Sequence, residues 1–372
     1  MTHFIIRRYN KSETTKKIIL LIVFFSYSLC FCTNNSKLHI FRCDGKYGFV
    51  DDKLNVIISP IYDYAENFES DNYAIVGNNQ KGKSVIDKTG SLVDTNTNDC
   101  LLLCRLFDNV FYNNFDNYVY NLKTRRKSTY LNPVVSNPYY PDYLCPFDGW
   151  NESDNKAYIG LFDKEGKSYK VNLEIKRCYP IVDNFGFAIT SEWNGIIIDN
   201  KSNIILRNII NSGRNPSEGL LPVITSSKSG YVNCNGVFIF ECEFYEDYED
   251  YQIPSLDYPF KEGIAVVEKT KNHFIIYDRQ GNILMQDTYL YMCGCSSCGL
   301  ILCQKEKNGK LGYIDKKGTQ IFPFIFDEAE SFENGYAIVK YEANDCLLDL
   351  SGNLFRSNDL VAGKKKRYKN IK

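Results

Sequence analysis

Cysteine is the residue type whose spacing in this sequence most suggests chemistry. Four cysteines gather in the C-terminal part of the chain, namely Cys293, Cys295, Cys298 and Cys303. Closely spaced thiolates can ligate zinc or an iron–sulfur cluster. However, the spacing C-x-C-x2-C-x4-C matches no standard zinc finger, and no second C-x-x-C recurs. Loop cysteines pair in oxidising compartments, so we favour disulfides over buried thiols or a metal. Cys100 and Cys104 could likewise form a disulfide or pack in the core.

Carboxylates are densest between Glu241 and Asp257, where they alternate with tyrosines. Such acids beside aromatic rings could bind calcium or hold a sugar. No D-x-D-x-D-G calcium loop is present, so the favoured interpretation is a solvated loop inserted between strands. A glycosidase needs two carboxylates across a cleft, and the sequence does not locate such a pair.

Nucleophilic catalysis finds little support in the remaining residues. The chain has three histidines, and only His273 lies well inside the body, where its surroundings predict a hairpin turn. No G-x-S-x-G, P-loop or dinucleotide glycine pattern occurs. Trp150 and Trp193 are interpreted as packing residues. The sequence therefore predicts no enzyme, no cofactor and no catalytic residue.

The elements that position these residues belong to a repeat. Residues 309–339 contain an apolar strand, an Asp-Lys-Lys-Gly turn, a second strand ending at a proline, and a closing alternating strand. Residues 45–76 repeat that order, including Gly-Lys-Tyr-Gly, Tyr-Asp and Tyr-Ala-Ile-Val. Self-similarity of this length fixes the fold class before any other signal.

Strand physics explains the form of the unit. Alternation of apolar and polar residues over short runs buries one face of a strand. Asp-x-x-Gly between apolar runs predicts a hairpin turn, in which the aspartate accepts backbone N–H groups and glycine adopts positive φ. Gly48 and Gly312 lie inside strands and predict a bulge or a close backbone approach between neighbouring units.

The phrase G-K-[WY]-G-[FY]-[IV]-D, followed by P-x-[YF]-D-x-A-x-x-F and then A-x-V, resembles the WG repeat of bacterial proteins. The resemblance is strong at Gly45–Val76 and Gly309–Val339, and moderate over 186–299. Tyr47 and Leu311 stand where the family has tryptophan, so the chain resembles a divergent member. The resemblance implies a β-rich repeat module and transfers no catalytic residue.

The chain is therefore expected to be all-β, with about eight and a half three-stranded antiparallel units of about 36 residues each. Residues 38–151 are assigned to repeats one to three, the third degenerate. Residues 152–358 hold repeats four to eight and a half-repeat, and 359–372 form a basic C-terminal tail. A propeller blade has four strands and usually more residues. We thus favour an open, curved solenoid-like array, with a closed β-propeller as the alternative.

The N-terminus predicts export. A basic segment precedes the apolar run Ile18–Cys32, which is short for a membrane span and typical of a signal peptide. Residues 1–32 are interpreted as a signal, cleaved by an ordinary signal peptidase or lipidated at Cys32. Its removal leaves twelve cysteines, an even number compatible with disulfides. The expected location is periplasmic, outer-membrane-anchored or extracellular.

Charge is nearly balanced, with 44 basic and 45 acidic residues, so no overall field favours nucleic acid. Membrane contact is expected only through a possible N-terminal lipid anchor. A repeat array presents an extended surface, which predicts a non-catalytic binding or scaffold module for a protein or carbohydrate partner. The alternatives are a carboxylate-dependent glycan hydrolase and a metal or redox role for Cys293–Cys303.

Overall fold

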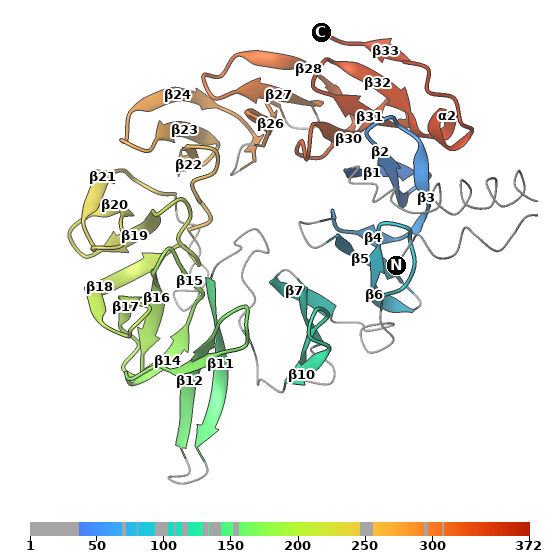
Figure 1. Cartoon of the computed structure of the whole chain (residues 1–372). Helices are drawn as coiled ribbons and strands as arrows, with labels where there is room; N and C mark the ends of the chain where they lie inside the picture. The colour runs from blue at the N-terminus through green and yellow to red at the C-terminus, as the bar shows by residue number, and fades with distance from the viewer. Residues whose placement is uncertain are drawn as a thin grey trace, which may run out of the picture. The chain divides into compact units, whose positions relative to one another are not determined.

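The computed structural model describes residues 37–372 except 69–71, 80, 94–102, 108, 114–117, 129–132, 134–142, 152–155, 246–255, 294–296 and 307–308. Residues 1–36, which include the predicted signal and Cys32, lie outside this range. The described residues form small antiparallel sheets with a single short helix, α2 (Ser357–Val361) (Figure 1). The predicted all-β class and small antiparallel sheets are confirmed.

The sheets follow one another in chain order, and most strands pair with their neighbours in sequence. The N-terminal ones are β1 (Leu38–Cys43), β2 (Lys46–Asp51) and β3 (Val56–Tyr62); β4 (Tyr64–Ala65), β5 (Tyr73–Asn78) and β6 (Gly82–Asp87); and β7 (Leu103–Phe107), β8 (Val110–Asn113), β9 (Tyr118–Asn121) and β10 (Arg126–Ser128). Strands β8 to β10 therefore supply a three-stranded set where the sequence shows only a degenerate repeat.

A longer connected sheet occupies the middle of the chain. It comprises β11 (Tyr143–Asn151), β12 (Lys156–Phe162), β13 (Ser168–Lys170), β14 (Ile175–Cys178), β15 (Ile181–Val182), β16 (Phe185–Thr190), β17 (Gly195–Asp199), β18 (Ile204–Ser212), β19 (Leu221–Thr225), β20 (Ser229–Val232) and β21 (Phe238–Glu241). Within it, β16–β18 and β19–β21 form two three-stranded sets. In each set the first (inner) and second (central) strands are largely buried and the third (outer) strand is more exposed.

Three further sheets complete the body. They are β22 (Ile264–Thr270), β23 (His273–Asp278) and β24 (Ile283–Thr288); β25 (Tyr291–Met292), β26 (Leu300–Gln304), β27 (Leu311–Asp315) and β28 (Gln320–Phe326); and β29 (Glu328–Ala329), β30 (Tyr336–Tyr341), β31 (Asn344–Asp349), β32 (Asn353–Arg356) and β33 (Lys369–Asn370). Residues 359–372, predicted as a basic tail, thus include the end of α2 and strand β33. Tyr368 and Ile371 pack on the core of the last sheet.

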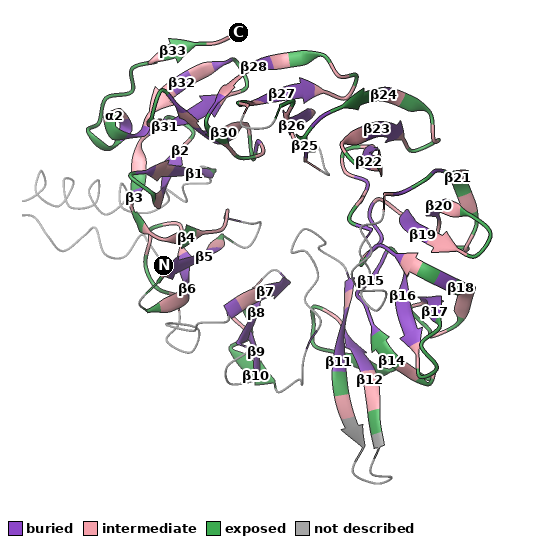
Figure 2. Cartoon of the chain, turned by 180° about the vertical axis from the view of Figure 1, so that it is seen from behind, coloured by how far each residue is buried: buried purple, intermediate pink, exposed green. Residues whose placement is uncertain are grey.

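Neighbouring sheets share their cores, because alternate side chains of one strand point to opposite faces. Ala337 and Val339 of β30 belong to the cluster shared with the β25–β28 sheet, whereas Ile338 between them belongs to another cluster. Inner and central strands are accordingly buried on both faces, while outer strands are exposed. Figure 2 shows this contrast between β17, which is largely buried, and β24, which is largely exposed. Stacking of units supplies the core that one unit lacks.

An aspartate or asparagine ends each central strand and organises the turn that follows. In most of these turns its Oδ1 accepts the N–H groups of the residues two and four positions later, as at Asp315, where Lys317 N and Thr319 N lie at 2.9 Å and 2.8 Å. The same arrangement occurs at Asp51, Asp87, Asp163, Asp199, Asn233, Asp278 and Asp349. The predicted role of the recurring aspartate is thereby confirmed.

Asp315→Ala should lower the free energy of unfolding by about 1–2 kcal/mol, because two backbone N–H groups lose their acceptor. Asp315→Asn should retain most of that stability, since Asn233 makes both bonds in its own turn at 2.9 Å and 3.1 Å. Urea unfolding of both variants measures the difference. Equal losses in the two variants would contradict the assignment of the effect to these hydrogen bonds.

Candidate functional site

The first and last sheets of the described chain pack against each other. Phe41 and Val50 share one buried cluster with Ile338 and Leu347, and Leu360 of α2 completes it. Strand β1 lies beside β30 and β31 (Figure 1). Residues almost 300 positions apart in sequence are thus joined by an apolar contact, which we call the junction.

Charged side chains cross the junction beside this apolar cluster. Arg42 of β1 donates from Nη2 to Asp345 Oδ1 at 3.0 Å and to Glu328 Oε2 at 2.7 Å. Lys340 Nζ donates to the other oxygen of Glu328 at 2.9 Å. The hydrogen bonds from Lys340 and Arg42 hold the pKa of Glu328 below its usual value. Glu328 is therefore paired within its own sheet through Lys340 and across the junction through Arg42.

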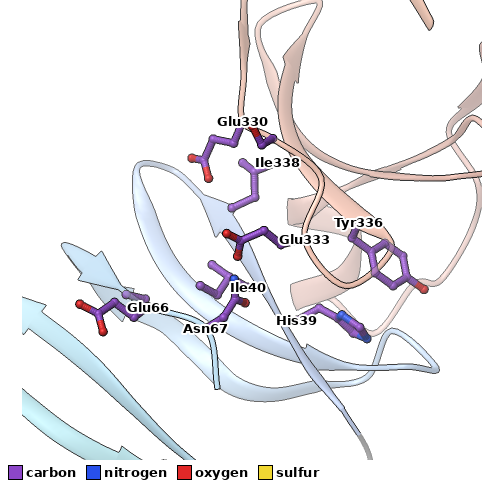
Figure 3. Close-up of a pocket in the computed structure, with 10 residues that line it drawn as sticks. His39, Ile40, Glu66, Asn67, Glu330, Glu333, Tyr336 and Ile338 are labelled. Carbon is purple, nitrogen blue, oxygen red and sulfur yellow. The ribbon is translucent and has the colours of Figure 1, made fainter. Parts of the chain in front are cut away.

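A cavity of about 340 Å³ opens at the junction and is the candidate functional site. Its lining comes from both ends of the described chain: His39, Ile40, Ala65, Glu66 and Asn67, and Glu330, Ser331, Glu333, Tyr336 and Ile338. Figure 3 shows these side chains projecting from the two ribbons, with His39 beside Tyr336. Among the described residues, three carboxyl groups and no lysine or arginine line this junction cavity. Its volume lies in the range of small-molecule sites.

Glu330 differs electrostatically from Glu328, which lies two residues earlier. Enclosure by protein is the largest influence on Glu330 and raises the pKa of its carboxyl group; the negative charge of Glu333 acts in the same direction. Arg42 and the Tyr47 hydroxyl, 3.5 Å from Oε1, oppose the increase without cancelling it. The junction cavity therefore holds a carboxyl group that accepts a proton more readily than a free glutamate.

His39 forms one end of the cavity and is a structural residue there. Its side chain is 3% exposed, and Nε2 lies 2.8 Å from Asp52 Oδ1. The ring lies 4.6 Å from that of Tyr336, centroid to centroid. Nδ1 has no hydrogen-bond partner among the described residues and is sealed from solvent. The ring thus connects β1 to β30 and exposes no nitrogen to a ligand.

A pH titration should separate Glu330 from Glu328. The raised pKa of Glu330 means that its ionised form weakens the fold above the unfolded pKa, and that this penalty disappears as the pH falls. Glu330→Gln should therefore be more stable than the parent at pH 7 and equal to it near pH 4. Glu328→Gln is the matched control with the opposite sign, because its lowered pKa stabilises the fold at neutral pH and that gain is lost on acidification. Thermal unfolding from pH 4 to 8 measures both, and identical pH profiles would contradict the assignment.

Comparison with protein families supports the repeat assignment. The family model of the WG containing repeat matches residues 47–83 and 312–343. The chain contains WG repeats. Both matches run from a central strand to the hairpin that starts the next sheet, and each supplies its alanine-glutamate pair, Ala65-Glu66 or Ala329-Glu330, to the junction region. The junction cavity is therefore lined by the same position of two WG repeats.

Sequence comparison with curated proteins finds no match. Solved structures of similar topology include a eukaryotic initiation factor, at 10% identity, covering 86% of this chain and 95% of that one, with a TM-score of 0.44. Apo AztD from Citrobacter koseri is 10% identical and covers 85% and 91%, with a TM-score of 0.41. BamB from Moraxella catarrhalis is 10% identical and covers 75% and 94%, with a TM-score of 0.34. At such scores these likenesses carry no functional inference.

Residues of the WG motif have visible structural roles in this protein. Lys46 forms an ion pair with Asp63, and Lys310 at the same repeat position forms one with Asp327. Gly48 allows the backbone of β3 to approach within its own sheet, next to a register shift in the β2–β3 pairing. The predicted bulge is present, whereas the close approach lies within one unit and not between neighbouring units as predicted.

The cysteine cluster does not form the predicted disulfides among the described residues. Cys303 is buried in β26 and packs in the cluster shared with the β22–β24 sheet, whereas Cys293 and Cys298 pack on the cluster of the opposite face. Because the sheet separates them, Cys303 cannot pair with either without rearrangement. Among the described residues no disulfide joins Cys293, Cys298 or Cys104 to another cysteine, while Cys295 and Cys100 lie outside the described residues. Burial raises the pKa of Cys303 to about 12, which keeps the thiol protonated.

The other candidate residues of the sequence do not line the junction cavity. Within the described part of the chain, no group of three or more His, Cys, Asp or Glu side chains could hold a metal ion. His273 begins β23, where its Nε2 lies 3.0 Å from Gln286 Nε2. Most of the acidic insert, 246–255, lies outside the described residues. The described helix α2 is five residues long, so no described helix could span a membrane.

Proposed function

We propose that this WG-repeat-containing protein is a non-catalytic binding module of the cell envelope, and that the junction cavity receives a basic group of a protein partner. The observation that carries the proposal is the lining of that cavity. Glu66, Glu330 and Glu333 face it together with Asn67 and Ser331, and no lysine or arginine among the described residues lines it. Charge complementarity would draw a ligand ammonium or guanidinium group to these carboxyl groups.

The contrast with the rest of the chain supports a binding role. Aspartates that recur in every unit are engaged in turn hydrogen bonds, and the recurring Lys–Asp pairs satisfy each other. Chemistry that is repeated along the array is therefore structural. The junction cavity differs because the equivalent acids of two repeats, Glu66 and Glu330, line one cavity there.

We infer that the array closes on itself through the junction, and we prefer this arrangement to an open solenoid. Support comes from the apolar cluster of Phe41, Val50, Ile338 and Leu347, and from the Arg42 ion pairs with Asp345 and Glu328. An open array would leave both sets of side chains exposed to water, at a cost in buried apolar area. Closure also fixes the distance across the cavity.

Calorimetric titration with a blocked tetra-lysine peptide and a blocked tetra-glutamate peptide tests the binding role. The lysine peptide should bind, and Glu330→Gln should weaken it about tenfold, since one charge-assisted contact is lost. Glu192→Gln, an exposed glutamate outside the cavity, should leave affinity unchanged. Equal affinity for both peptides, or no binding of either at millimolar concentration, would refute the proposal.

Export forms part of the proposal, and its support is the apolar run at residues 18–32. Intact mass of the protein from envelope fractions of its host should show a chain beginning near Thr33, or near Cys32 with added acyl chains. Mass after alkylation with and without reduction counts disulfides directly. An uncleaved chain would end the export proposal while leaving the binding proposal standing.

A second candidate function is glycan hydrolysis, and one observation favours it. Glu330, with its raised pKa, lines the same cavity as Glu66, and an acid beside a carboxylate is the pair that glycosidases use. Release of reducing sugar from a broad glycan panel tests this role. Activity lost in both Glu330→Gln and Glu66→Gln would establish it, and no activity on the panel would end it.

A further inference from the structure

A second cavity lies far along the chain from the junction, where the β11–β13 strands face the β17–β18 turn. Its volume is about 400 Å³. It is lined by Leu144, Leu161, Tyr169, Lys170, Asn172, Asn200, Lys201 and Ser202, and we call it the Tyr169 cavity. A smaller cavity of about 190 Å³ adjoins it and shares Leu144 and Asn200. Both belong to the middle region, where the sequence motif is weakest.

The charge of the Tyr169 cavity is the opposite of that of the junction cavity. Lys170 and Lys201 line it, and no aspartate or glutamate among the described residues does. Lys170 follows Tyr169 in β13 and its Nζ lies 5.1 Å from the ring centroid of Tyr158, so Lys201 is the lysine whose charge faces the cavity together with Tyr169. The nearest turn carboxylate, Asp199, is engaged with Lys201 N at 2.8 Å and with the backbone and side-chain nitrogens of Asn203 at 2.7 Å. Asp163 and Glu165 line the adjoining cavity together with Lys164. The Tyr169 cavity itself therefore favours an anion.

Neutral polar groups and one aromatic ring complete the lining. The Ser202 hydroxyl accepts the N–H of Asn172 at 3.4 Å and keeps its own proton to donate. Asn200 Nδ2 donates to Asn184 Oδ1 at 2.9 Å, and this hydrogen bond sets the orientation of the Asn200 amide oxygen. Tyr169 is 40% exposed, and Lys167 lies 5.0 Å from its ring centroid. A flat, partly exposed ring bordered by amides and a hydroxyl suits a ligand with many hydroxyl groups.

We propose that the Tyr169 cavity binds a carboxylate-bearing oligosaccharide, with Lys201 pairing with a carboxylate and Tyr169 packing against a sugar ring. The amide and hydroxyl groups of Asn172, Asn200 and Ser202 hydrogen-bond the sugar hydroxyls. This site is separate from the junction cavity and does not depend on the function proposed for it.

A saccharide fits this cavity better than a nucleic acid. Nucleic acids are held by extended rows of basic residues that neutralise many phosphates. Here two lysines line the cavity, and the acidic Asp163 and Glu165 lie in the adjoining one. Such a balanced neighbourhood would repel a polyanion of high charge density, whereas a sugar acid carries one carboxylate per ring or fewer.

Calorimetry with full-length protein and three probes tests the proposal. The probes are tetragalacturonate or an alginate tetramer, the neutral sugar maltotetraose, and a single-stranded DNA decamer. The acidic tetrasaccharide should bind, and Lys201→Gln should weaken it about tenfold, whereas Lys170→Gln should have little effect. Tyr169→Leu should weaken it by a similar factor. Lys317→Gln is the matched control, because Lys317 follows Asp315 by the same two positions as Lys201 follows Asp199.

Urea unfolding of each variant confirms that the fold is retained, since all three side chains are exposed. Glu330→Gln should leave saccharide binding unchanged, which separates this site from the junction cavity. Equal binding of maltotetraose would overturn the acidic class of the ligand. Tighter binding of DNA that is lost in the same variants would overturn the saccharide proposal, as would no binding of any acidic probe at millimolar concentration.

Discussion

Phe41→Ala should lower the free energy of unfolding by about 3–5 kcal/mol, because a fully buried aromatic side chain leaves a cavity. Phe41 is 0% exposed and belongs to the cluster that also contains Ile338 and Leu347. The lost contacts therefore join the two ends of the chain. We expect the loss to be accompanied by faster amide hydrogen exchange in β31, whose central residues pack on Phe41 from the far end of the sequence.

Phe49→Ala is the matched control for this prediction. Phe49 is also 0% exposed, but its cluster contains Ala74, Val76 and Ile86 of the adjacent sheet and no residue of the last one. Its loss should cost a similar free energy while leaving exchange in β31 slow. If Phe41→Ala and Phe49→Ala accelerate β31 equally, the junction is not a separate contact and the chain unfolds without regard to its ends.

The strands and turns could be predicted from the sequence because their determinants are local. The turn aspartates accept hydrogen bonds from groups two to four residues away, so the short motif Asp-x-x-Gly is enough to predict the turn. The three-stranded set β8–β10 was not predicted as a clear repeat, because its turn at Asn121 has no glycine and uses Thr124 N at 2.9 Å instead. Because the Asn121 turn departs from the recurring motif, the sequence pattern did not indicate this hairpin.

The junction could not be predicted from any short sequence motif. Whether a repeat array closes depends on the small rotation between successive units, summed over all of them. Arg42 and Asp345 are 303 positions apart, and neither belongs to a recurring pattern that would link them. The sequence favoured an open array because its units show three strands each, whereas a propeller blade has four. Side-chain pairing across the junction is the observation that supports closure.

The junction cavity had a partial signal in the sequence. Glu66 follows Asp63-Tyr-Ala, and Glu330 follows Asp327-Glu-Ala, so the two acids occupy one repeat position. That equivalence marks them as a pair without placing them in one cavity. For the cysteines, closeness in sequence did not predict closeness in space. Cys293 and Cys303 are close in sequence, but Cys303 of β26 packs in one core and Cys293, which follows β25, packs on the core of the opposite face of the sheet.

Gly48→Ala should cost about 1–3 kcal/mol, because the added methyl group has no space. A Cβ at this position would lie 2.6 Å from Ile58 O and 2.7 Å from Pro60 N. Both are backbone atoms of β3, so relief requires the strand to move and its pairing with β2 to loosen. The glycine of the WG motif is therefore required by the approach of the third strand of its own sheet.

Gly312→Ala tests this explanation at the same motif position of the other strong repeat. There a Cβ would meet the Phe324 ring at 2.9 Å and Phe322 O at 3.1 Å. Because the ring can turn aside and the backbone contact is longer, this substitution should cost less than Gly48→Ala, at about 1 kcal/mol or below. Urea unfolding ranks the two variants. A larger loss for Gly312→Ala would show that side-chain packing, and not the backbone approach, selects glycine at this position.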